Sequence, residues 1–260
     1  MPINETKAYQ TFRDHLLWLE TDVQVIDSIC NYAQKELNKK VKEDDLSPES
    51  SMSSVMGVNI LKYNKLTHPW RQSRKIFNQT INRRFEYAIC QLYSYFVDYL
   101  HEILFELYIK NPKKVVENLT KNSKGSNFSF DYYDVIKLGT YSALEHQMVD
   151  TVFRKLEDER DTKKLMTKIL KCAGIDDLVD NKINEALQYL ELRHLFVHHK
   201  GIVDEFYARV YGNLFTPALN KGHQVPRTYT TYSNAVTKIS TLVHIIDQKL
   251  ISTGLVNIRR

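Results

Sequence analysis

The stretch from Glu191 to Tyr207, ELRHLFVHHKGIVDEFY, holds the residues of this sequence that best suit chemistry. Arg193 carries a permanent charge, and its forked donors fit phosphate oxygens. His198 carries an imidazole, the side chain that most readily takes or gives a proton at cellular pH. Together they are the minimum set for RNA transesterification, because they offer a base for the ribose 2′-hydroxyl and a cation for the charge that gathers on the phosphate.

The spacing of this pair also predicts how it works. Five residues on an ideal helix turn the side chain by about 140°, so Arg193 and His198 do not share a face. Arginine is long, however, and the helix is expected to end at Gly201, so both side chains could reach one pocket at the helix terminus. One pair is too little for two proton transfers. We therefore expect a dimer that brings two copies together.

A zinc site is the first alternative for the same stretch. His194 and His198 have the i, i+4 spacing of two ligands on one helix, and His199 could be a third ligand. The HExxH pattern of zinc hydrolases is missing, because Leu, Phe and Val stand between the first two histidines. No metal site is predicted.

A purely structural role is the second alternative. His194 lies on the predicted apolar stripe of its helix, where it could be a hydrogen-bonded core residue. Arg193 could form an ion pair with Glu191 or Asp204. Spacing alone does not decide between this role and catalysis.

Other nucleotide and hydrolase motifs are absent from the sequence. It contains no GxxxxGK[ST], no GxGxxG, no GxSxG and no HD dipeptide. Mononucleotide, dinucleotide and serine-hydrolase functions therefore have no support, and no cofactor is predicted.

Composition predicts a helical protein of the cytoplasm. Of the 260 residues 43% are hydrophobic, whereas Gly (8) and Pro (6) are scarce, which favours long helices over loop-rich β structure. The net charge of +5 is compatible with a nucleic-acid partner. Three separated cysteines indicate buried residues in a reducing compartment. No signal peptide or membrane-length apolar run is found, so no membrane contact is predicted.

Hydrophobic periodicity predicts one all-α domain over residues 1–260, a helical bundle with long connections at 41–70 and 111–130. The connection at 41–70 could be a surface loop or a partner-binding segment. A Thr21-Asp22 cap could split the first helix, and a short strand could occupy 225–232. The helices are expected at 5–40, 73–109, 113–119, 134–156, from Leu165 to near Gly174, from Asp180 to the break at Gly201, at 202–211 and at 235–250.

Two further clusters leave their function open. Five cations near the start of the second long helix could steer a polyanion or form a solvated face. Four tyrosines of the same helix could stack on bases or belong to the core. The cations are Arg71, Arg74, Lys75, Arg83 and Arg84, and the tyrosines are Tyr93, Tyr95, Tyr99 and Tyr108.

The sequence RHLFVHHKGIVDEFY resembles the signature of the HEPN superfamily, the higher eukaryote and prokaryote nucleotide-binding domains. That signature is Arg, four to six residues, then His, commonly with a polar residue after the Arg. Arg193, His194 and His198 match it. The continuation through Gly201 is similar to a HEPN group related to a RiboL-PSP-associated family, although His199 stands where Asn is usual.

The resemblance implies a HEPN-type helical fold and a metal-independent endoribonuclease that acts as a homodimer, with a composite active site at the interface. It implies a toxin or phage-defence effector that cuts tRNA or other RNA and has an antitoxin or regulatory partner. Arg193 would stabilise the scissile phosphate, His198 would move protons and His194 would support the geometry; His199 and Lys200 are candidates for binding substrate. The alternative is a catalytically silent HEPN module that binds RNA or protein.

Overall fold

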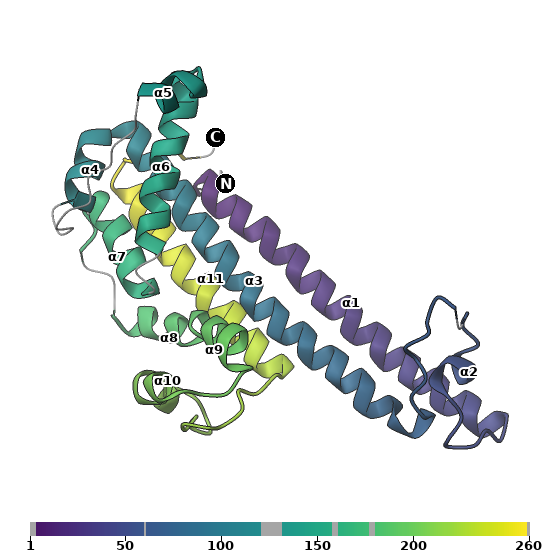
Figure 1. Ribbon diagram of the computed structural model, residues 1–260. Coiled ribbons are helices and arrows are strands. Elements are labelled where there is room, and N and C mark those ends of the chain that lie inside the picture. Colours follow the sequence, from purple (N-terminus) through teal and green to yellow (C-terminus); the bar gives the residue numbers. More distant parts are fainter. Residues whose placement is uncertain (1–3, 60, 121–131, 158–160, 177–179, 259–260) are drawn as a thin grey trace. The chain divides into compact units, whose positions relative to one another are not determined.

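The computed structural model describes residues 4–59, 61–120, 132–157, 161–176 and 180–258 (Figure 1). These residues form helices joined by turns, and no strand occurs among them. Pairing of extended segments is limited there to isolated bridges, such as the one between Thr6 and Ile258. The prediction of an all-α fold is confirmed.

The helices agree with the predicted ones in place, with different ends. They are α1 (Lys7–Glu43), α2 (Met52–Met56), η1 (Trp70–Gln72), α3 (Ser73–Lys110), α4 (Pro112–Thr120), α5 (Tyr132–Leu138), α6 (Tyr141–Glu157), α7 (Thr162–Cys172), α8 (Asp180–Leu190), α9 (Leu192–His199), α10 (Glu205–Val210), η2 (Gly212–Leu214) and α11 (Tyr229–Ser252).

Some details of the predicted layout are wrong. Helix α1 continues through Thr21 and Asp22, where Thr21 Oγ1 donates to the Leu17 carbonyl at 2.8 Å instead of capping a new helix. No strand forms at 225–232, because α11 begins at Tyr229. The helix predicted at 134–156 is instead two helices, because α5 ends at Leu138 and α6 begins at Tyr141. The short helix predicted at 113–119, within the connection at 111–130, is α4, and 121–130 lies outside the described residues.

The chain divides into two compact units. The first comprises Met1–Leu16, Ile89–Val225 and Ser233–Arg260, and the second comprises Leu17–Ala88 and Pro226–Tyr232. Helices α1, α3 and α11 contribute residues to both. The single-domain assignment of residues 1–260 stays a prediction.

The carboxyl-terminal part of α3 forms the centre of the first unit. Phe96, Leu100, Ile103 and Leu104 are fully buried. Their spacing of four, three and one residues places them on one broad helical face. Helices that pack around such a face gain most of their stability from the burial of apolar surface.

A buried polar contact ties the amino-terminal segment to α11 in the same unit. Thr6 Oγ1 donates to Asp247 Oδ1 at 2.5 Å, and the Tyr99 hydroxyl lies 3.5 Å from the same oxygen. Tyr99 and Tyr108 are buried, so they belong to the core and cannot stack on bases.

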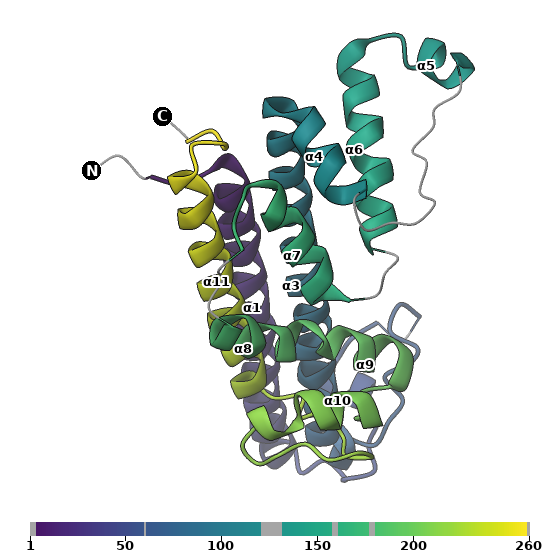
Figure 2. The ribbon, with the colours of Figure 1, turned by 90° about the vertical axis from the view of Figure 1, so that its left-hand side faces the viewer.

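Helix α8 lies across α11 in both views of the ribbon (Figures 1 and 2). Lys238 Nζ of α11 is 2.8 Å from Glu185 Oε2 of α8, and Lys182 is also near this carboxylate. Both lysines lower the pKa of Glu185 through hydrogen bonds. This crossing positions α8, and therefore the chain that follows it, on the carboxyl-terminal helix.

The connection predicted at 41–70 has more structure than expected. Helix α1 reaches Glu43, and the short helix α2 is capped by Ser51, whose hydroxyl accepts from the Ser54 amide. Met52 donates its backbone N–H to the His68 carbonyl at 2.9 Å, which closes the two ends of the segment on each other. Within the second unit this stretch is a compact turn rather than an open loop.

Two of the five cations near the start of α3 are paired within the second unit. Arg71 Nε lies 2.8 Å from Glu49 Oε1, and Arg84 forms an ion pair with Asp22. The Arg84 guanidinium also lies 4.9 Å from the centre of the Tyr87 ring. Arg74, Lys75 and Arg83 are exposed, so the cluster is in part a solvated face.

Candidate functional site

The predicted motif lies on a helix that restarts after a break. Helix α8 ends at Leu190 and α9 begins at Leu192, with Glu191 between them. One continuous helix was predicted to bury His194 and Val197 on its apolar stripe. After the break, other residues of α9 are buried: Leu192, Leu195 and Phe196. In the structure Val197 is 56% exposed and His194 is also exposed.

The buried face of α9 consists of Leu192, Leu195 and Phe196. These residues anchor the helix, and all three of its histidines are left on accessible faces. The alternative that made His194 a core residue is therefore wrong. An exposed imidazole can reach a substrate, a metal ion or a second protein chain.

A left-handed turn ends α9. Lys200 has φ 55° and Gly201 has φ 78°, and the N–H groups of both donate to the Leu195 carbonyl. Glycine adopts this conformation without strain, as the sequence predicted for position 201, but Lys200 is the first residue to adopt it. Gly201 is also buried, and its carbonyl accepts from the Val225 N–H at 2.8 Å.

Helix α10 begins at an aspartate cap. Asp204 Oδ1 accepts the Tyr207 N–H at 2.7 Å, an arrangement that satisfies a free donor of the first turn. The Tyr207 side chain is buried, and its hydroxyl donates to the Gln188 carbonyl of α8 at 2.5 Å. Burial raises the pKa of Tyr207 well above its ordinary value, so this phenol stays a donor.

Arg193 rests on an aromatic ring. Its guanidinium carbon lies 4.6 Å from the centre of the Tyr93 ring of α3, which is within the range of a cation–π contact. Among the described residues it forms no ion pair with Glu191 or Asp204, and Asp204 lies beside His199 instead. The charge of Arg193 nevertheless lowers the pKa of Glu191, against the larger effect of burial, so the two residues interact electrostatically.

Arg193 and His198 line the same cleft, whose volume is about 840 Å³. Their side chains leave the helix in different directions, but both reach this hollow, as the length of arginine suggested. His194 lines it as well, whereas His199 and Lys200 are not among its described lining residues. The remaining described walls of the cleft are Tyr93, Asp161, Thr162, Leu165, Leu190, Glu191, Asp204 and Phe206.

The electrostatics of this cleft favour an uncharged His194. Partial burial of its ring lowers the pKa, and the neighbouring His198 and His199 lower it further. The ring centres of His194 and His198 are 5.0 Å apart. Burial raises the pKa of Glu191, which stands at the break before α9.

A second cleft of about 340 Å³ adjoins the first and shares Arg193 and Tyr93 with it. Its wall contains His101 and Asp150, with His101 Nε2 2.8 Å from Asp150 Oδ1. Sequence reasoning missed this pair, since its members lie on α3 and α6 and no local pattern connects them. Tyr93 was missed as a partner of Arg193 for the same reason. The cap at Asp204, by contrast, could have been predicted from the sequence, because aspartate is a preferred residue at the start of a helix.

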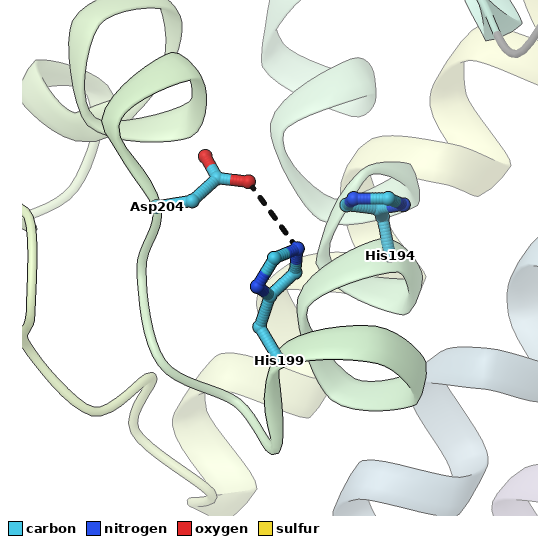
Figure 3. Close-up of side chains that lie close together, drawn as sticks. All are labelled: His194, His199 and Asp204. Carbon is cyan, nitrogen blue, oxygen red and sulfur yellow. Dashed lines mark ion pairs between the residues drawn. The ribbon is translucent and has the colours of Figure 1, made fainter.

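The side chains that could bind a metal ion together are not the three histidines considered from the sequence. The ligand atoms of His194, His199 and Asp204 lie within 4.8 Å of one another (Figure 3). His199 Nε2 is 3.7 Å from Asp204 Oδ2. His198 is not a member of this group, although its spacing from His194 had made it the first choice.

Comparison with known proteins found no match to this chain. Neither models of protein families, nor curated proteins, nor solved structures match this chain. Among the described helices none is both long enough and apolar enough to cross a membrane.

Proposed function

We propose that this protein is a metal-independent endoribonuclease, acting as a toxin or phage-defence effector on tRNA or another RNA. The observation that carries the proposal is the cleft, which Arg193 and His198 line together. The Arg193 guanidinium lies on the Tyr93 ring, and His198 is exposed. The similarity of the stretch from Arg193 to Tyr207 to the HEPN signature supports the same conclusion.

The two side chains take complementary parts in the proposed reaction. His198 removes the proton of the ribose 2′-hydroxyl, whose oxygen then bonds to phosphorus as the bond to the 5′-oxygen breaks. The Arg193 fork binds the phosphate oxygens on which negative charge increases. Tyr93 beneath the guanidinium holds it in place at 4.6 Å. His194, 5.0 Å from His198 between ring centres, supports the orientation of that ring.

The leaving 5′-oxygen needs a proton, and His198 of the same chain has just accepted one. In the proposed homodimer a second copy of the motif supplies the acid and a second cation. His199 and Lys200 are proposed to contact the RNA beside the cleft, since both are exposed at the end of α9. We further propose a cytoplasmic site of action and an antitoxin or regulatory partner.

The test is cleavage of total RNA by the purified protein in EDTA. Cleavage is expected to persist with the metal removed and to yield ends that carry a 2′,3′-cyclic phosphate, because the 2′-oxygen is the nucleophile. The His198→Ala protein is purified in parallel, since activity that survives in it comes from a contaminant. Intact RNA with both proteins, together with retained RNA binding, would contradict the proposal and favour a silent binding module.

Dimerisation is a separate expectation with its own measurement. Light scattering coupled to size-exclusion chromatography is expected to give twice the chain mass at micromolar concentration. A strictly monomeric protein that still cleaves RNA would refute the shared active site and leave the chemistry of the single cleft intact.

A further inference from the structure

His194, His199 and Asp204 form a compact group of metal-ligand side chains beside the proposed catalytic pair. Every pair of their ligand atoms is within 4.8 Å. Figure 3 shows His194 and His199 on α9, with the Asp204 carboxylate facing them from the chain that follows. His199 Nε2 lies 3.7 Å from Asp204 Oδ2, and the rings of His194 and His199 have centres 5.1 Å apart.

The backbone between these residues is held in a fixed turn. After the left-handed residues at 200 and 201, Ile202 forms a bridge with Gln224, and Val203 donates its N–H to the His223 carbonyl at 2.9 Å. The Gln224 side chain donates to the carbonyls of Lys200 and Gly201, each at 3.1 Å. Both sides of the group are thus positioned by long-range contacts.

The carboxylate is itself oriented. Asp204 Oδ1 is occupied by the Tyr207 N–H, and the Tyr207 ring is fixed by its hydrogen bond to Gln188. The other oxygen, Oδ2, is the one that lies near His199. Carboxylates that bind metal ions are commonly held by a hydrogen bond of this kind: one oxygen accepts it, and the other oxygen is thereby directed at the ion.

The chemistry of the three groups selects the class of ion. Two imidazole nitrogens and one carboxylate oxygen suit Zn²⁺ and its neighbours, whereas Ca²⁺ and Mg²⁺ prefer oxygen ligands alone. Tetrahedral bonds to zinc of about 2.0–2.2 Å require ligand atoms roughly 3.3 Å apart. A contraction of about 1.5 Å at most is needed, which rotation of two exposed imidazole side chains can supply.

The geometry points to a site for a divalent transition metal of the zinc class, made of His194, His199 and Asp204. It leaves a fourth position for water and leaves His198 outside the ligand set. Asp161 and Glu191 line the cleft that His194 and Asp204 also line. A bound ion would hold the His194 ring and add positive charge beside His198. Metal binding is therefore expected to inhibit RNA cleavage, a consequence that rests on the proposed function.

The site itself is tested without any activity measurement. The full-length protein is freed of metal and titrated with Co²⁺, whose visible absorption reports nitrogen and oxygen ligation, and then with Zn²⁺ in competition with a chromophoric chelator. One ion per chain is expected. His199→Ala and Asp204→Asn are expected to weaken zinc binding by at least about tenfold. Asparagine also caps helices, so the second variant keeps the start of α10.

His198→Ala is the matched control, because it removes an imidazole from the same helical turn but not from the ligand set. It is expected to bind zinc as the wild type does. The proposed site would be overturned if the wild type bound no zinc, or if His199→Ala and Asp204→Asn bound zinc as tightly as the wild type. It would also be overturned if His198→Ala lost as much zinc affinity as those two variants. Circular dichroism of every variant separates a lost ligand from a lost fold.

The inhibitory consequence has its own readout. Zinc is expected to slow RNA cleavage by the wild type several-fold more than it slows cleavage by Asp204→Asn, each relative to its rate in EDTA. Equal inhibition of the two proteins by zinc would overturn the proposed regulatory role. Whether the metal site exists is decided separately, by the cobalt spectrum. Absence of cleavage in EDTA would count against the proposed nuclease alone.

Discussion

Alanine at either Arg193 or His198 is expected to slow RNA cleavage by about 10²–10⁴-fold. A general base contributes a factor of that size, and removal of one preorganised donor to a developing oxyanion costs about 10²–10³-fold. Because the two residues act on one phosphate in one cleft, the double variant is expected to be little worse than the poorer single variant. Single-turnover rates on a defined RNA provide the measurement.

Arg209→Ala serves as the control for charge. Arg209 is exposed on α10, where its guanidinium lies 6.0 Å from the Phe206 ring, and it lines neither cleft. Its loss lowers the net charge by the same amount as the loss of Arg193. If both arginine variants cleave equally slowly, long-range attraction of RNA explains the effect. In that case the assignment of Arg193 to the scissile phosphate is wrong.

Leu195→Ala is expected to lower the free energy of unfolding by about 2–5 kcal/mol, because it leaves a cavity under the motif helix. Leu195 is 1% exposed, and its carbonyl also accepts the N–H groups that end α9. Urea unfolding followed by circular dichroism gives the value. The same truncation reduces the support for the histidines, so cleavage is expected to fall with it.

Val197→Ala, two residues further on the same helix, is the matched comparison. Val197 is 56% exposed, and its truncation is expected to change stability by no more than about 0.5 kcal/mol. The two variants test which residues of α9 are buried. The structure buries Leu195 and exposes Val197, whereas one uninterrupted helix from 180 onward was predicted to bury Val197. Equal losses would mean that α9 does not restart after Glu191.

The proposed metal site and the proposed nuclease share His194 but depend on different neighbours. His198 is the proposed base and lies outside the ligand group, whereas the adjacent His199 belongs to that group and is proposed only to contact RNA beside the cleft. On a helix, adjacent residues differ by about 100° in direction, which is why one can line the cleft and the other can face Asp204. Exchange of roles between them is therefore not expected, and their alanine variants separate the two proposals.

Local sequence determined the helical class of this protein and the place of its candidate motif. The apolar spacing in 73–109 predicted α3 because a helix of 3.6 residues per turn gathers these residues on one face whatever else the chain does. Gly201 predicted the end of the motif helix because a left-handed turn is nearly free of strain at glycine. The types of Arg193 and His198 predicted the kind of chemistry.

Tertiary structure alone decided which groups meet. The break at Glu191 shifts the helix phase, so His194 is exposed where an unbroken stripe would bury it. Tyr93 beneath Arg193, and the approach of Asp204 to His199, follow from contacts that no local periodicity encodes. The physical reason is that local spacing sets the direction of a side chain on its own helix. What that side chain faces depends on the packing of segments far apart in the chain.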